Sequence, residues 1–199
     1  MAESPERKNS MSLLDLAETV YQTMPGYRPE VVEGRLVVNL PADFGHARAL
    51  TQLTLALAPL ETLGVNVVQS VGLWLPSGDD YVVPDLAVVE EDVKEHLVAF
   101  NCYAPHVFRM VVEVTSSNLT SDIVAKPLAY ARAGVPVYLI GDRRARRVSL
   151  LTDPRDGEYR TRSTYRPGET FVLPESVAPV GSVGEKIEVG ADILLGPPA

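Results

Sequence analysis

Two acidic residues stand inside apolar stretches of the sequence. Asp85 lies in VVPDLAVV and Glu113 lies in MVVEVT. A carboxylate inside an apolar strand is costly to bury unless it is paired, hydrogen-bonded or bound to a metal ion. Each has an ordinary explanation when taken alone. Asp85 could accept backbone hydrogen bonds beside Pro84, and Glu113 could point to the solvated face of its strand.

Two such carboxylates on strands that could be neighbours are typical of a site for a hard divalent cation. Mg²⁺ takes oxygen ligands, commonly one or two carboxylates with waters completing the octahedron. Such an ion lowers the pKa of its bound water and stabilises charge on a phosphate that is being cleaved. We therefore expect Asp85 and Glu113 to hold Mg²⁺ or Mn²⁺, with a protein cation close to the attacked phosphate.

Lys126 is the candidate for that protein cation. The chain has four lysines, at positions 8, 94, 126 and 186, and Lys126 follows the Glu113 strand in a segment with a strong helical pattern. Asp122 lies four residues earlier and would share its helix face. Alternatively, Pro127 fits a first helical turn, so the helix could begin near Lys126 and leave Asp122 in the preceding loop. Tyr130 would lie one turn later on the same side, where packing is its more common role.

His46 and Glu33 are second-rank candidates. A histidine at a helix start could orient a water or contact a phosphate, although a cap or a surface position is the commoner role of a lone histidine. Glu33 could join the metal site from the first predicted hairpin, in which Glu33-Gly34 forms a turn. Ser116 and Ser117 are not surrounded by the G-x-S-x-G pattern of a nucleophilic serine.

The periodicity of the chain predicts an α/β fold. We expect a mixed β-sheet of the restriction-endonuclease-like kind, flanked by helices, with additional β-hairpins in the N- and C-terminal parts. The strand, helix and strand between Phe108 and Ile140 predict a parallel crossover. Helical spacing indicates helices over 12–24, over 46–63 with a kink at Pro59, and up to about 133. Strand patterns cover 31–40, 65–75, 81–89, 108–115, 136–140, 147–151, 159–165, 170–173 and 187–189.

The length and composition favour one domain in a reducing cytoplasm. A chain of 199 residues, 46% hydrophobic and 22% charged, suits a single globular domain over 12–199 after a disordered leader over 1–11. No apolar run approaches the roughly 20 residues of a membrane span, and the N-terminal segment lacks the apolar core of a secretory signal. The single cysteine, Cys102, cannot form an internal disulfide.

The charge distribution bears on nucleic-acid partners. A net charge of −8 argues against a protein that grips nucleic acid by general electrostatic attraction. Between Asp142 and Arg166, however, eight arginines stand against four acids. This segment is either a local basic surface or, more commonly for such a pattern, a solvated hairpin whose arginines keep an edge strand from aggregating.

Taken together, these motifs resemble the Uma2 family, formerly a domain of unknown function, in the PD-(D/E)XK restriction-endonuclease-like superfamily. The resemblance covers roughly residues 12–151. It rests on Pro84-Asp85, Glu113-Val114-Thr115-Ser116, Asp122, Lys126, Tyr130 and Gly134-Val135-Pro136-Val137-Tyr138.

The resemblance implies a metal-dependent endonuclease that hydrolyses phosphodiester bonds in DNA, with Asp85 and Glu113 as metal ligands. In the superfamily a lysine stands two residues after the glutamate, where this chain has Thr115, so its role would pass to Lys126. A homodimer would provide two active sites, one for each strand of a duplex. RNA is an open alternative substrate. A catalytically silent protein of the same fold, acting as a binding or assembly partner, is the alternative that the acidic charge and Thr115 favour.

Overall fold

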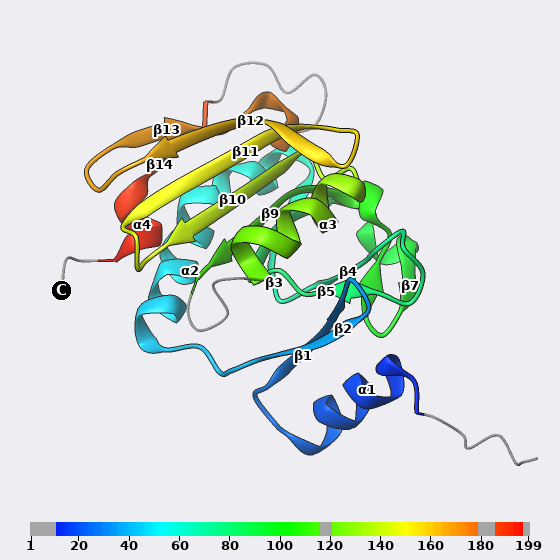
Figure 1. Ribbon diagram of the computed structural model, residues 1–199. Helices are drawn as coiled ribbons and strands as arrows, with labels where there is room; N and C mark the ends of the chain where they lie inside the picture. The colour runs from blue at the N-terminus through cyan, green and yellow to red at the C-terminus, as the bar shows by residue number, and fades with distance from the viewer. Residues whose placement is uncertain (1–10, 116–120, 179–185, 197–199) are drawn as a thin grey trace, which may run out of the picture.

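The computed structural model describes residues 11–115, 121–178 and 186–196, and contains two six-stranded sheets (Figure 1). The first sheet has the order β12-β11-β10-β9-β6-β3. Its strands are β3 (Val65–Gln69), β6 (Leu86–Glu90), β9 (Phe108–Val114), β10 (Val137–Asp142), β11 (Arg147–Arg155) and β12 (Glu158–Tyr165). β9 and β10 run parallel and the other neighbours are antiparallel, so the predicted mixed sheet and its parallel pair are confirmed.

The second sheet has the order β2-β1-β5-β4-β8-β7 and includes the predicted N-terminal hairpin. Its strands are β1 (Arg28–Val32), β2 (Arg35–Asn39), β4 (Gly72–Trp74), β5 (Tyr81–Val82), β7 (Leu97–Ala99) and β8 (Cys102–Tyr103). A further hairpin pairs β13 (Thr170–Val172) with β14 (Glu188–Gly190). The α-helices are α1 (Leu13–Thr23), α2 (Phe44–Leu57), α3 (Lys126–Arg132) and α4 (Ala191–Leu195).

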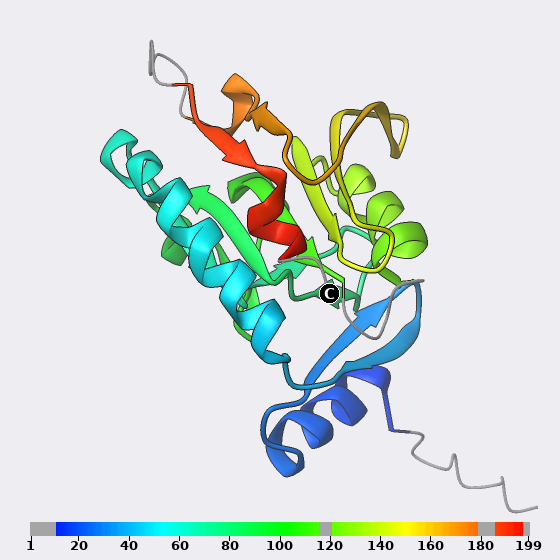
Figure 2. The same ribbon diagram turned by 90° about the vertical axis from the view of Figure 1, so that its left-hand side faces the viewer.

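The two faces of the first sheet bury different partners, as Figure 2 shows from the side of α2. Alternate residues of a strand point to opposite faces. On β9, Met110, Val112 and Val114 pack in a core that α2 and α4 cover. Val111 packs in the other core, with residues of α3 and of the second sheet. Glu113 shares the alternation of Val111 and therefore faces α3 and the second sheet.

The position of Asp85 is a correction to the predicted strands. The runs 65–75 and 81–89, each expected as one strand, are divided between the two sheets. The chain leaves the first sheet at Ser70, whose φ is 56°, and returns to it after Val83 and Pro84. Proline has no N–H to donate to a ladder, which favours a break here. Asp85 therefore lies in the link before β6 rather than inside a strand.

The helix boundaries follow local capping. Ser12 caps α1 and forms a capping box with Asp15, whose carboxylate accepts from the Ser12 backbone N–H. The segment expected as one helix over 46–63 is α2 followed by a 3₁₀ helix over Ala58–Leu63, with Pro59 in its first turn. α3 begins at Lys126 with Pro127 in the first turn, as in the second of the two predicted arrangements. The segment before it is not the expected loop, however, because Ser121–Ala125 forms a turn of π-helix that includes Asp122. The short helix α4 was not predicted.

The arginine-rich segment forms the β10–β11 turn and the β11–β12 hairpin, and several charges of the hairpin are neutralised within it. Arg155 Nε lies 2.7 Å from Asp153 Oδ1, and Arg160 Nη2 lies 2.8 Å from Asp156 Oδ2. These pairs are exposed, so the solvated hairpin is the better description of this segment. Within the described ranges, no helix has both the length and the apolar character that a membrane crossing requires.

Candidate active site

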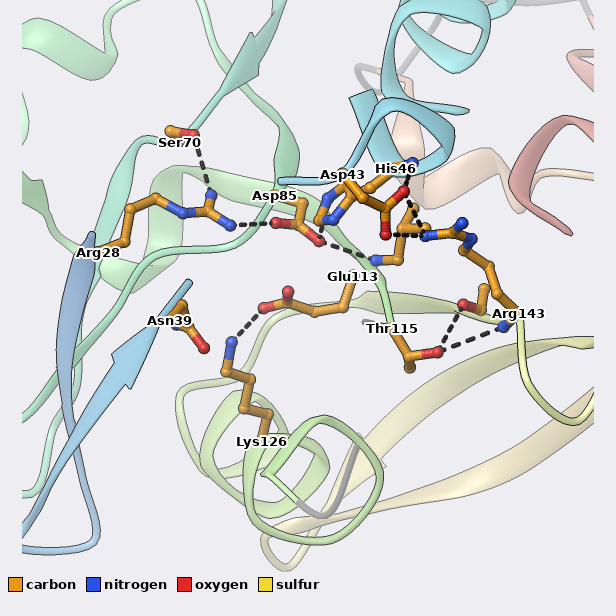
Figure 3. A network of polar contacts seen from close by, with 12 residues as sticks. Arg28, Asn39, Asp43, His46, Ser70, Asp85, Glu113, Thr115, Lys126 and Arg143 are labelled. Atoms are coloured by element: carbon orange, nitrogen blue, oxygen red, sulfur yellow. Dashed lines mark hydrogen bonds and ion pairs between the residues drawn. The ribbon is translucent and has the colours of Figure 1, made fainter. Parts of the chain in front are cut away.

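Asp85 and Glu113 lie side by side where the two sheets meet (Figure 3). Leu86 pairs with Val112 in the antiparallel register of β6 and β9, which sets Asp85 opposite Glu113 one step further along. The backbone N–H of Val114 donates to Asp85 Oδ2 at 2.9 Å. Both carboxylates are buried, with exposed fractions of 2% for Asp85 and 4% for Glu113. The structure thus brings together two acids that are far apart in the sequence.

Contacts with Arg28 and His46 hold Asp85 ionised. Arg28 Nη2 lies 2.6 Å from Oδ1, and His46 Nε2 lies 3.1 Å from Oδ2. Burial alone would raise the pKa of Asp85, but the contacts with His46 and then Arg28 outweigh it and hold the pKa well below its usual value. The Asp85 carboxylate is therefore negatively charged at physiological pH, and its oxygens can act as ligands for a cation.

Lys126 joins Glu113 to a third buried carboxylate, Glu30. Its Nζ lies 2.7 Å from Glu113 Oε1 and 3.1 Å from Glu30 Oε1 and Oε2. The Tyr130 hydroxyl also donates to Glu113 Oε1, at 3.1 Å. Burial, and next the charge of Glu113, raises the pKa of Tyr130, so the phenol keeps its proton and remains a donor. Lys126 and Tyr130 stand one turn apart on α3, as the sequence predicts.

Glu30 is a site residue that the sequence reasoning missed. It is fully buried in β1 and also accepts hydrogen bonds from the Val83 N–H at 2.7 Å and from Asn39 Nδ2 at 2.9 Å. The same signal that marks Asp85 and Glu113 was available, because Glu30 stands beside the valines of PEVV.

Glu33, a second-rank candidate from the sequence, is not brought to this cluster. It lies in the two-residue turn between β1 and β2 with a φ of 51°, and its side chain is 46% exposed. Its Oε1 accepts from Arg132 Nη1 at 3.2 Å. The Glu33 carboxylate therefore forms a surface ion pair, away from the Asp85 and Glu113 oxygens.

His46 reaches the cluster from the first turn of α2. The cap of this helix is Asp43, whose carboxylate accepts from the His46 backbone N–H at 2.9 Å. The imidazole is 3% exposed, and neither ring nitrogen has a hydrogen-bond partner among the described residues. Its Nε2 is close to Asp85, but the ring N–H does not point at that oxygen. The contact is therefore electrostatic, because a short donor–acceptor distance with a poor N–H···O angle is not a hydrogen bond.

Thr115 and Asp122 complete the sequence candidates. The Thr115 hydroxyl donates to the Gly141 carbonyl and accepts from the Arg143 N–H, both at 3.3 Å, so it joins the ends of β9 and β10. Lys126 of α3, rather than residue 115, supplies the ammonium group beside Glu113. The side chain of Asp122 lies outside the described residues, as do Ser116 and Ser117.

Comparison with protein families decides the relationship. The family described as "Uma2: Putative restriction endonuclease" matches residues 17–181. The chain belongs to the Uma2 family. A crystal structure described as a "putative nuclease belonging to DUF820" from Anabaena variabilis matches with a TM-score of 0.66. It is 14% identical, and the match covers 92% of this chain and 97% of that one, which shows a shared fold. Comparison with the curated proteins gives no significant match.

The donors of this Uma2-family site suit a hard cation. Asp85 and Glu113 offer carboxylate oxygens, and His46 Nε2, which has no hydrogen-bond partner in the described part of the chain, lies 3.1 Å from Asp85 Oδ2. No three His, Cys, Asp or Glu side chains form a ready-made cage within the described residues. Mg²⁺ does not need one, because it keeps several waters and binds through one or two carboxylates. Carboxylate oxygens suit hard cations such as Mg²⁺ and Mn²⁺, whereas Zn²⁺ commonly takes nitrogen and sulfur ligands.

The two glutamates of the β1–β2 hairpin provide a matched pair of variants. We expect Glu30→Gln to lower the free energy of unfolding by about 2 kcal/mol, because Lys126 loses a buried charged partner. Glu33→Gln should change it by less than about 0.5 kcal/mol, since exposed ion pairs contribute little. Thermal unfolding of both variants measures the difference. Equal effects would show that Glu30 is not part of the buried charge cluster.

Proposed function

We propose that the protein is a metal-dependent endonuclease that hydrolyses phosphodiester bonds in DNA. The observation that carries the proposal is the meeting of Asp85 and Glu113 at adjoining positions, with Lys126 Nζ 2.7 Å from Glu113. The Uma2 family and the similar crystal structure both have a nuclease in their descriptions, which supports the same reaction class.

Asp85 and Glu113 would hold Mg²⁺ or Mn²⁺. When bound, the ion supplies a water of lowered pKa and stabilises the negative charge that grows on the phosphate. Lys126 and Tyr130 both contact Glu113 Oε1, so they fix this carboxylate in its orientation. Arg28 and the Val114 N–H do the same for Asp85. This support leaves two preorganised carboxylates and places the Lys126 charge beside them.

Two further features belong to the proposal. A homodimer would present two such sites to the two strands of a duplex, because a twofold axis relates both the subunits and the strands. The sequence features of the chain, including its single cysteine, favour the cytoplasm as the place of action.

Metal binding by titration calorimetry is the direct test of the site. We expect Mg²⁺ or Mn²⁺ to bind the full chain at millimolar concentration or below, and Asp85→Asn to weaken binding at least about tenfold, since a carboxylate ligand is lost. Incubation with plasmid DNA, and in parallel with RNA of similar length, then identifies the substrate. A protein that binds neither metal at millimolar concentration would contradict the proposal.

One observation favours a silent scaffold as the second candidate. Arg28 approaches Asp85 Oδ1 at 2.6 Å and Lys126 lies between Glu30 and Glu113, so protein cations already neutralise much of the cluster. In that case neither metal binds, and removal of Asp85 lowers stability without affecting any cleavage. The same titration therefore separates the two functions.

A further inference from the structure

A pocket of about 640 Å³ adjoins the carboxylate cluster on the side of Arg28. It lies between α1, the beginning of β1 and the turn that joins β7 to β8. Its walls carry three aromatic rings and several polar groups. The residues that matter here are Tyr21, Arg28, Ser70, Tyr81, Phe100 and Asn101. A volume of this size is typical of pockets that take small organic ligands.

The aromatic wall favours a planar occupant. Tyr81 and Phe100 both line the pocket, and their rings are nearly parallel, with an interplanar angle of 9° and centroids 6.5 Å apart. The ring of Trp74, which is not among the lining residues, is nearly parallel to both. Phe100 is 47% exposed, and Tyr21, which lines the same pocket, is 63% exposed. A flat ring could stack on such surfaces, because parallel aromatic faces attract one another at an offset.

The placement of Phe100 is difficult to explain by folding alone. Phe100 and Asn101 form the two-residue turn between β7 and β8, with φ values of 50° and 55°. Turns of this kind favour asparagine and glycine, and a bulky residue with positive φ adds backbone strain. The ring also remains half exposed, so its burial offsets little of that cost. Strain of this type often accompanies ligand sites.

Arg28 connects the pocket to the cluster. Its Nη2 contacts Asp85 Oδ1 at 2.6 Å and its Nη1 contacts Ser70 Oγ at 3.1 Å, while its side chain is 28% exposed. The planar guanidinium fork matches the oxygens of a phosphate. A purely apolar occupant would remove this cation from water without offering it an acceptor, which is costly. The pocket therefore suits a ligand with both a flat ring and an adjacent anion.

We propose that this pocket binds an unstacked nucleobase of the substrate strand, next to the phosphate that Arg28 contacts. This inference rests on the proposed nuclease function and adds a substrate class, namely a strand with at least one unpaired base. Stacking on aromatic side chains tolerates any base, since every base has a π-face. The site would thus prefer single-stranded or locally opened nucleic acid over regular duplex, without reading a sequence.

The test is direct binding of a short fluorescein-labelled single-stranded oligodeoxynucleotide in EDTA, where cleavage does not interfere. We expect Phe100→Leu to weaken binding about tenfold, because base–aromatic stacking is worth about that factor. Phe100→Tyr keeps the ring and should restore affinity. Phe44→Leu removes another exposed aromatic ring, outside this pocket, and should bind as wild type. A matched duplex should bind more weakly than the single strand, and Phe100→Leu should leave duplex binding unchanged.

The outcomes separate this proposal from the one on which it rests. If Phe100→Leu binds the single strand as wild type does, and the protein cleaves DNA with Mg²⁺, base binding in the pocket is contradicted and the proposed nuclease function is not. Tighter binding of single strands that depends on the ring, in a protein that cuts nothing, would support the pocket and contradict the nuclease. Should Phe100→Leu change the molecular mass measured by light scattering while oligonucleotide binding is unchanged, the ring is a contact between copies of the chain and the proposal is wrong.

Discussion

Asp85→Asn and Glu113→Gln are each expected to lower the rate of DNA cleavage by about a thousandfold or more. Each amide keeps the shape of its side chain and removes the negative charge that would hold the metal ion. Charge stabilisation by such an ion is worth several kcal/mol, and each 1.36 kcal/mol of barrier is a factor of ten in rate. Single-turnover cleavage of plasmid DNA at saturating Mg²⁺ or Mn²⁺ measures the loss.

A control variant makes this expectation specific. Glu33→Gln is the control, because its carboxylate is exposed and paired with Arg132, so full activity is expected. The pKa of Asp85 is held well below its usual value by His46 and Arg28 against the effect of burial, so its protonation does not shape activity near neutral pH. Undiminished cleavage by both Asp85→Asn and Glu113→Gln, measured on folded protein, would contradict the assignment of these residues.

The spacing of apolar residues along the sequence indicated the fold, and the charged residues inside apolar strands indicated the site. β9 is apolar over its whole length apart from Arg109 and Glu113, which predicts a central strand and marks the glutamate as unusual. The parallel pairing of β9 with β10 follows from the helix between them. The proximity of Asp85 and Glu113 depends on tertiary register, which the sequence does not give. Their shared pattern suggested a common site, and the resemblance to Uma2 implied the same pair of residues.

The missed features have physical reasons. Apolar runs such as 65–75 show that a segment is extended and buried, but they do not show that it passes from one sheet to another. Glu33 was the candidate acid of the first hairpin, but it lies in a two-residue turn with positive φ at both positions, and its side chain is 46% exposed. Glu30, three residues earlier, is within the strand and meets Lys126, a contact across 96 residues of sequence. Arg28 offers no sequence signal, because a strand arginine is ordinarily a solvated residue.

Lys126→Met should be the most destabilising of the single substitutions considered. The variant leaves Glu30 and Glu113 buried without their shared ammonium group, and breaking a buried ion pair from one side costs about 3–5 kcal/mol. For a chain of this size, a loss of that order lowers the melting temperature by about 10 °C. Lys94→Met, at an exposed position, is the control and should melt as wild type.

A second substitution separates lost charge pairing from lost packing. If uncompensated charge is the cause, Lys126→Met combined with Glu30→Gln should be more stable than Lys126→Met alone, because one of the two unpaired carboxylates is gone. Millimolar Mg²⁺ should also raise the melting temperature of Lys126→Met more than that of wild type, since a cation that binds the folded state stabilises it. A double variant less stable than Lys126→Met, with no response to Mg²⁺, would show that Lys126 stabilises the fold by packing. The carboxylates would then have no demonstrated affinity for a cation.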